Sequence, residues 1–214
     1  RRDDQFFVLH LIRSCLVSHR TKIRDADAPA EWSDFLDPKW KGKIGINPPW
    51  RSVAAQEMIA YWESQGARDV AARLKANDVR FFNGSAGVVQ AVVRGDVLVA
   101  ATIEPPAISA LDDGAPIRVR YPKSGVPATT AVGFVPAKSP NPDAGMLFLN
   151  WAMSQAGQQS LQDIAGAPAV RPGLKPPKLV PGLDGMRIVL TESVLTHERQ
   201  KSMIDEWRTV FGVK

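Results

Sequence analysis

The stretch FFNGSAGVVQAVVRGDVLVAA, residues 81–101, decides how the rest of the chain is interpreted. Two short apolar runs, one ending at Phe82 and the other covering Val97–Ala101, flank an Asn-Gly-Ser turn and a segment of helical character. Apolar runs that are bounded by turn residues and joined by a helix are typical of a βαβ unit in a parallel sheet. We therefore expect an α/β fold with this unit in its buried sheet.

The turn inside this stretch is a candidate ligand site. Its residues are Asn83, Gly84, Ser85 and Ala86. Unpaired N–H groups and the positive end of the helix dipole at such a position favour a ligand oxygen or an anion. A plainer interpretation makes Ser85 an ordinary helix N-cap and Gly84 the residue that supplies a positive φ. The triplet also fits an N-glycosylation sequon, although the turn alone explains it.

Composition is that of an ordinary globular protein. The 214 residues are 44% hydrophobic and 23% charged, which allows one large domain or two small ones. The net charge is +5, but Lys and Arg are spread along the chain, which favours solvated faces over a nucleic-acid surface. No run reaches the roughly 18 apolar residues of a membrane span. The single cysteine, Cys15, excludes an internal disulfide and is expected to be a buried small side chain.

Periodicity and turn residues predict the other elements. Strands are expected at 6–17, 43–47, 117–121 and 129–135, and helices at 32–36, 52–66, 67–76, 107–111, 142–155, from 157 onward, and 192–211. In the helix that begins near Asn141, the residues expected to be buried are Met146, Leu147, Leu149, Trp151 and Ala152. His10 lies in the first apolar run and is expected to be a satisfied core or edge residue.

Enzyme motifs are absent from the sequence. It contains no phosphate-binding P-loop, zinc-protease helix, nucleophile elbow or calcium loop. The three histidines are scattered, and Asp112-Asp113 marks a turn because adjacent side chains point apart. We therefore expect no catalytic residue, no metal ligand and no cofactor, and a protein that is not an enzyme.

Three polar segments follow predicted strands. Open α/β sheets bind ligands at the carboxyl ends of their strands, so these segments are expected to form one binding edge. Each residue alone could also be a helix cap or a surface residue. The candidate ligand-binding residues are Arg51, Ser52, Asn83, Gly84, Ser85, Ala86, Thr102 and Glu104.

Two longer motifs resemble those of a known family. The sequence APAEWSDFLDPKWKGKI, residues 28–44, is similar to a signature of bacterial extracellular solute-binding proteins of ABC importers, and it is closest to their ferric-iron-binding branch. Residues 139–144, SPNPDA, and residues 148–158, FLNWAMSQAGQ, resemble a second signature of that family. Val88–Val97 resembles a third segment, so the similarity extends over about residues 8–212.

The resemblance implies a type II periplasmic-binding fold, in which two α/β lobes joined by a two-strand hinge close on a ligand. Residues 22–128 correspond to the second lobe, whereas residues 1–21 and 129–214 supply hinge strands and a remnant of the first lobe, mainly its C-terminal helices. Leu11–Thr21 and Thr129–Val135 resemble the crossing strands. The first lobe is thus expected to be incomplete, and no signal peptide stands in the sequence as given.

The resemblance also implies a function. It predicts a periplasmic, monomeric receptor that captures a small polar or anionic solute, or a metal–anion complex, and delivers it to a membrane permease, with no nucleic-acid partner. Iron-binding members place a tyrosine pair after the strand that matches Val97–Ala101, but this chain has Thr102–Pro106 there. Tyrosinate ligation is therefore not expected; Glu104 could supply an oxygen ligand or bind an ammonium group. The alternatives are an effector-sensing regulatory domain of the same fold and a truncated, non-functional homologue.

Overall fold

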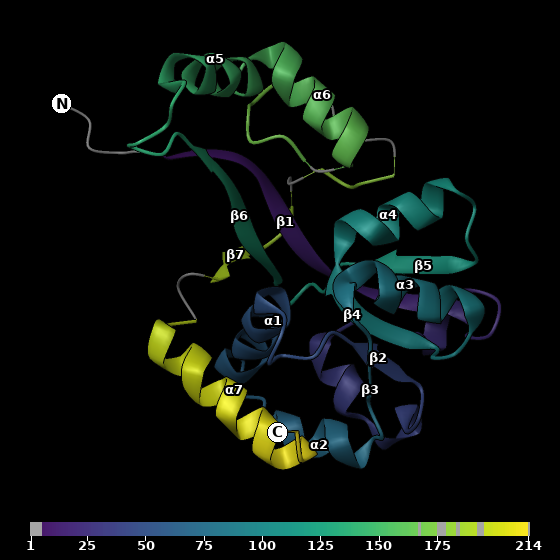
Figure 1. The fold of residues 1–214 in the computed structure, drawn as a ribbon. Helices are drawn as coiled ribbons and strands as arrows, with labels where there is room; N and C mark the ends of the chain where they lie inside the picture. Colours follow the sequence, from purple (N-terminus) through teal and green to yellow (C-terminus); the bar gives the residue numbers. More distant parts are fainter. Residues whose placement is uncertain (1–5, 167, 175–178, 183–184, 192–194, 214) are drawn as a thin grey trace. The chain divides into compact units, whose positions relative to one another are not determined.

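The computed structural model describes residues 6–166, 168–174, 179–182, 185–191 and 195–213, and it has the expected mixed α/β architecture (Figure 1). The chain divides into two compact units. The larger unit comprises Arg13–Ala128 and Met186–Lys214, and the smaller unit comprises Arg1–Ile12 and Thr129–Gly185. No helix in the described ranges is long and apolar enough to cross a membrane.

The predicted βαβ unit is confirmed in the larger unit. Strand β3 (Arg80–Phe81) leads through helix α3 (Gly84–Arg94) to strand β4 (Val99–Ile103). Both strands pair in parallel with β2 (Ile44–Ile46), which lies between them. The carboxyl ends of these three strands therefore meet at one edge of the sheet, as the sequence predicted.

Two long strands run through both units. They are β1 (Phe6–His19) and β6 (Val126–Phe134), and each extends across a boundary between the units. Within the larger unit, β1 is antiparallel to β4 and to the edge strand β5 (Ile117–Arg120), while β6 is parallel to β7 (Ile188–Leu190). The strand order is β3-β2-β4-β1-β6-β7, with β5 on β1.

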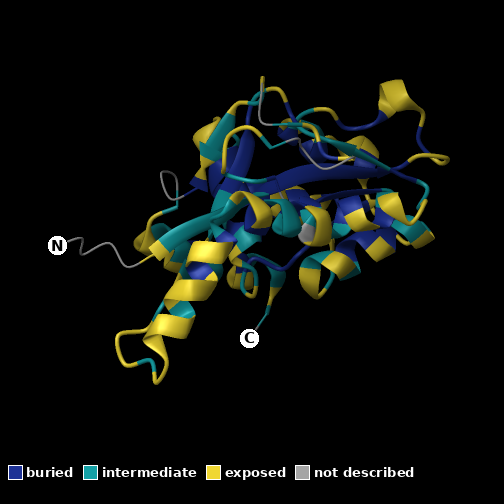
Figure 2. Cartoon of the chain, turned by 90° about the horizontal axis from the view of Figure 1, so that it is seen from above, coloured by how far each residue is buried: buried dark blue, intermediate teal, exposed yellow. Residues whose placement is uncertain are grey.

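The core of the larger unit lies on both faces of this sheet. Successive strand residues point to opposite faces, so Leu16 enters one apolar cluster while Cys15 and Val17 enter the other. One cluster contains residues of α1 (Val53–Ser64), α2 (Val70–Ala76) and α7 (His197–Phe211), together with the 3-10 turns η2 (Trp32–Leu36) and η3 (Pro38–Trp40). The other cluster contains residues of α3 and α4 (Glu104–Asp112). A further 3-10 turn, η1, covers Asp25–Asp27. Figure 2 shows buried strands and helices that carry exposed residues on one side.

The smaller unit contains α5 (Pro142–Ala152) and α6 (Gln155–Ala165). The burial predicted for α5 is correct for Leu149 and Ala152 but wrong for three residues, since Met146, Leu147 and Trp151 are 40%, 72% and 45% exposed. The helix is apolar on several sides, but only one side packs inside the unit. Leu149 lies over Gly133 of β6, where a β-carbon would be only 2.6 Å from the leucine side chain.

Three further predictions differ from the structure. Helix α4 begins at Glu104 rather than at residue 107, because prolines are tolerated in its first turn. His10 is not satisfied, since its buried Nδ1 has no hydrogen-bond partner among the described residues. The predicted last helix begins at residue 197; residues 192–194 lie outside the described ranges. That helix, α7, packs on α2 in the larger unit.

Candidate functional site

A hollow of about 120 Å³ lies at the carboxyl ends of β2 and β3 in the larger unit. It is bounded by the connection from β2 to α1 and by the turn from β3 to α3. The lining residues are Asn47, Pro48, Arg51, Ser52, Asn83, Gly84 and Ser85. The structure therefore brings together five of the eight residues that the sequence selected.

Two helices begin at this hollow. At the start of α1, the Oγ of Ser52 accepts a hydrogen bond from the N–H of Ala55 at 3.3 Å. At the start of α3, the N-cap residue is Asn83, whose side chain makes no capping bond with any described residue. Gly84 has a φ of +69°, which confirms the positive φ predicted for the turn. Two positive dipole ends and uncapped N–H groups therefore favour a negatively charged ligand here.

Asn47 is a site residue that the sequence analysis missed. It is buried at the end of β2, where its Oδ1 accepts a hydrogen bond from the Ser85 hydroxyl at 3.1 Å. Its Nδ2 donates to the carbonyl of Phe82 at 3.0 Å, so the orientation of the amide is fixed from both sides. The N-cap role suggested for Ser85 is wrong, because the residue lies inside the first turn of α3. A polar residue directly after the apolar run of β2 was the signal for Asn47.

Arg51 supplies the positive charge of the hollow. Its side chain is exposed, and it forms no ion pair with any other residue in the described part of the chain. Among the residues that line the hollow it is the single charged one. An anion bound between the two helix starts would therefore gain a charge-assisted hydrogen bond as well as the backbone donors.

Thr102 lies beside this hollow rather than in it. Together with Asn47, Ala55 and Met58 it lines a second depression that has no room for a water molecule. The residue is only 4% exposed, and its Oγ1 has no hydrogen-bond partner among the described residues. Asn47 is common to both depressions, so it connects Thr102 to the main hollow.

The prediction that Glu104 contacts a ligand is wrong. The residue is fully buried, and its carboxylate accepts hydrogen bonds from the guanidinium of Arg13 and, at 2.6 Å, from the hydroxyl of Tyr121. Burial raises the pKa of Glu104, and the bonds from Arg13 and Tyr121 oppose that rise. Ala86, the eighth candidate, is exposed and lines neither depression. Glu104 is thus half of an internal ion pair.

The usual metal-ligand types do not gather in the described part of the chain. The described residues contain no group of three or more His, Cys, Asp or Glu side chains that could hold a metal ion. The two tyrosines of the chain, Tyr61 and Tyr121, donate their hydroxyls to the carbonyl of Ser124 and to Glu104. An open α/β fold with a polar hollow at its sheet edge is typical of ligand-binding proteins.

The chain belongs to the family of bacterial extracellular solute-binding proteins, whose family model matches residues 13–181. Among individual sequences, it is 22% identical over 160 residues to a Salmonella typhi protein named "Putative 2-aminoethylphosphonate-binding periplasmic protein". The match to the protein of that name in Salmonella typhimurium has the same identity and length. Each alignment covers 70% of this chain and 47% of the relative, so the chain spans about half the length of the curated relatives it matches.

Solved structures of periplasmic binding proteins share the fold. The substrate-binding protein of an ABC transporter from Agrobacterium tumefaciens superimposes with a TM-score of 0.82 at 18% identity, over 96% of this chain and 67% of that one. AfuA from Actinobacillus pleuropneumoniae, with exogenous fructose-6-phosphate bound, gives 0.81 at 20% identity, over 98% and 69%. Iron-bound HitA from Pseudomonas aeruginosa gives 0.80 at 22% identity, over 98% and 70%. The expected type II periplasmic-binding fold is therefore confirmed.

Proposed function

We propose that the protein is the solute-binding component of an ABC-type importer and captures a small anionic solute at the hollow between α1 and α3. The single observation that carries the ligand class is the meeting of two helix starts with the cation of Arg51, which has no ion-pair partner among the described residues. On this proposal the residues 22–128 form the ligand-binding lobe of a periplasmic, monomeric receptor. Its partner is a membrane permease.

The size of the hollow favours a compact oxyanion. Its volume of about 120 Å³ equals that of about four water molecules in the liquid, at roughly 30 Å³ each. A phosphate or phosphonate group matches this space and can accept several hydrogen bonds at once. The N–H groups at Gly84 and Ser85, the guanidinium of Arg51 and the remaining N–H of Asn47 are the donors on offer.

The names of related proteins support this ligand class. The Salmonella relatives are named for 2-aminoethylphosphonate, and the AfuA structure contains fructose-6-phosphate. Both compounds carry a tetrahedral phosphorus oxyanion. HitA is an iron-bound relative, but both tyrosines of this chain are engaged in internal hydrogen bonds. We therefore propose a metal-free anion as the solute.

Hinge closure on the bound anion is part of the proposal. A ligand shifts a hinge equilibrium only by its difference in affinity for the open and closed states. Donors on the larger unit would hold the anion first, and contacts made only after closure would then stabilise the closed form. β1 and β6, which run through both units, are the strands that would bend.

Calorimetric titration of the 214-residue chain tests the proposal. Inorganic phosphate, methylphosphonate and 2-aminoethylphosphonate are the probes, with acetate as a carboxylate comparison. Binding of one phosphorus oxyanion should raise the free energy of unfolding by about 2.7 kcal/mol at a hundredfold excess over the dissociation constant. Replacement Arg51→Gln should weaken that binding roughly ten- to a hundredfold, because a charge-assisted hydrogen bond is lost.

A matched variant controls for nonspecific charge effects. Arg20→Gln removes the same charge from an exposed arginine that does not line the hollow, and it should leave the affinity unchanged. Equal losses in Arg51→Gln and Arg20→Gln would mean that the anion is attracted by net charge alone. Failure of all three phosphorus compounds to bind the folded chain would overturn the proposed ligand class.

A further inference from the structure

Arg51 is the last residue of a tight turn between β2 and α1. Its N–H donates to the carbonyl of Pro48 at 3.0 Å, which closes a four-residue turn with Pro49 and Trp50 at its centre. The proline ring fixes one backbone angle of the turn, but Trp50 and Arg51 carry no such restriction. The place of Arg51 in the hollow therefore depends on what holds the two central residues.

The first central residue is held by Gln56 of α1. The Nε2 of Gln56 donates a hydrogen bond to the carbonyl of Pro49, and Gln56 is only 3% exposed. Pro49 is buried as well. A buried carbonyl that loses its donor is costly, so this bond favours one position of the turn.

The other end of the Gln56 amide is held by helix α7. Its Oε1 accepts a hydrogen bond from the Nε2 of Gln200 at 2.8 Å. Both ends of the amide are therefore engaged, and a chain of hydrogen bonds runs from Gln200 through Gln56 to Pro49. None of these three residues lines the hollow, so they act on a ligand only through the turn.

The second central residue, Trp50, packs in an aromatic cluster that also includes α7. The ring centroid of Trp50 lies 4.8 Å from that of Phe81 and 6.3 Å from that of Phe211. Phe81 and Phe211 meet edge to face at 4.8 Å, and Phe211 stacks on the fully buried Trp207. Both central residues of the turn are thus connected to α7.

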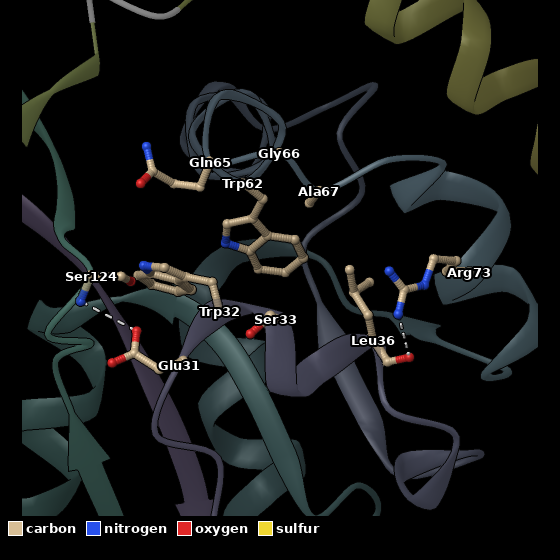
Figure 3. Close-up of a pocket in the computed structure, with 10 residues that line it drawn as sticks. All are labelled: Glu31, Trp32, Ser33, Leu36, Trp62, Gln65, Gly66, Ala67, Arg73 and Ser124. Carbon is tan, nitrogen blue, oxygen red and sulfur yellow. Dashed lines mark hydrogen bonds between the residues drawn. The ribbon is translucent and has the colours of Figure 1, made fainter.

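Helices α1 and α7 are themselves firmly anchored. The carboxylate of Glu63, near the end of α1, lies 2.6 and 2.7 Å from the Nη2 of Arg199 in α7. Trp62 is 2% exposed, and its ring centroid lies 5.9 Å from that of Trp32. Figure 3 shows these two indoles side by side at the wall of a cavity. Trp207 of α7 belongs to the same buried cluster as both indoles. The turn is therefore held by a rigid support.

We propose that Gln56 is a positioning residue for Arg51, and that α7 holds it in place through Gln200. Because the ligand is the anion of the proposed function, this role rests on that proposal. A charged hydrogen bond requires a defined distance and direction. A loosened turn would present Arg51 correctly for only part of the time, and the apparent affinity would fall by that fraction. The family model ends at residue 181, so α7 lies outside the matched range.

A double-mutant cycle tests this role by calorimetric titration of the 214-residue chain with methylphosphonate. Gln56→Met removes the amide and should weaken binding roughly three- to tenfold, which corresponds to about one net hydrogen bond. In a chain that already carries Arg51→Gln, the same replacement should change the affinity by less than about twofold, because the residue it positions is gone. Equal losses in both backgrounds would overturn the inference.

Asn77 provides a matched control for general destabilisation. It is 4% exposed in the larger unit, and its amide donates to the carbonyls of Phe35 and Asp37 at 3.3 and 3.2 Å, away from the hollow. Asn77→Leu should lower the free energy of unfolding and leave the affinity for methylphosphonate unchanged. A loss of affinity as large as that of Gln56→Met would mean that Gln56 acts only through overall stability.

Gln200→Met is the milder variant. It leaves the bond from Gln56 to Pro49 in place and removes only the contact with α7, on a half-buried side chain. It should weaken methylphosphonate binding roughly two- to fivefold. If Gln56→Met does not fold, this variant decides the outcome, and an unchanged affinity would count against the role of α7.

Hydrogen exchange of the Arg51 amide examines the turn without any ligand. Gln56→Met should accelerate this exchange roughly three- to tenfold, whereas Asn77→Leu should leave it unchanged. An unchanged rate in Gln56→Met would show that Gln56 does not hold the turn. Failure of methylphosphonate to bind would contradict the proposed function, and the exchange rates would still decide whether Gln56 fixes Arg51.

Discussion

Arg13 and Glu104 form a fully buried ion pair in the larger unit. The Arg13 Nε lies 3.0 and 2.9 Å from the two carboxylate oxygens, and Nη2 lies 2.8 Å from Oε2. Both side chains have no exposed surface. The guanidinium also stands over the ring of Tyr121, at 4.9 Å from its centroid. The pair joins β1 to the start of α4, near the point where β1 leaves the unit.

Removing the charge of Glu104 should strongly destabilise the protein. Glu104→Gln leaves the Arg13 guanidinium buried without its counter-ion, and the free energy of unfolding should fall by about 3–5 kcal/mol. Tyr121→Phe removes only the hydrogen bond to Oε2 and should cost less, about 1.5–3 kcal/mol. Urea unfolding of both variants measures the difference. A Glu104→Gln variant as stable as Tyr121→Phe would contradict this prediction.

Thr102 should be replaceable by valine without loss of stability. Its hydroxyl is buried and has no partner in the described structure, so the change to an isosteric methyl group should be neutral or stabilising. Thr191 is the matched control: it is equally buried, but its Oγ1 donates to the carbonyl of Ala128 at 3.3 Å. Thr191→Val should therefore cost about 1 kcal/mol. Thermal unfolding distinguishes the two, and equal destabilisation would refute the assignment.

Two leucines of α5 should respond very differently to truncation. Leu149 is 4% exposed and packs over Gly133, so Leu149→Ala should cost about 2–5 kcal/mol through the cavity it leaves. Leu147 lies on the opposite, uncovered side and is 72% exposed. Leu147→Ala should change stability by no more than about 0.5 kcal/mol. Denaturant curves provide the comparison, and a costly Leu147→Ala would show that this side is covered in solution.

His10 should make the protein less stable in mild acid. Burial lowers the pKa of His10 below its usual 6.5, so the unfolded chain binds a proton more readily than the folded one. Its contribution to stability is therefore complete above pH 6.5 and decreases as the pH falls through that value towards the folded pKa. His10→Leu should flatten this part of the curve of stability against pH. An NMR titration of the His10 ring with a midpoint above 6.5 would contradict the stated direction.

Local patterns in the sequence were sufficient to predict the parallel βαβ unit around α3. Apolar runs at Phe82 and Val97–Ala101, a glycine at the turn and helical spacing between them all indicate the same structure, and tertiary contacts do not override it. The prediction that the strand ends converge also follows from parallel topology alone. Five candidate residues consequently line one hollow.

Contacts between residues that are far apart in the sequence could not be predicted from local patterns. Glu104 lies at a strand end, as a ligand-binding residue would. Its partner Arg13, however, is 91 residues away in the sequence and pairs with it in the interior. The apolar residues of α5 give no indication of which side packs, because exposure depends on neighbours that the helix sequence does not specify. A cavity of about 440 Å³ beside Trp62 likewise combines residues of η2, the end of α1, α2 and the turn before β6, which share no motif.

Helix α1 begins at the hollow beside Ser52 and ends at the cavity beside Gln65. The separation of about 18 Å exceeds the screening length of about 8 Å in physiological salt. Charged molecules bound at the two ends of α1 would therefore interact only weakly through solvent. Any cooperativity between the two places would have to act through a small rotation or translation of α1 against the sheet, rather than through electrostatic attraction or repulsion.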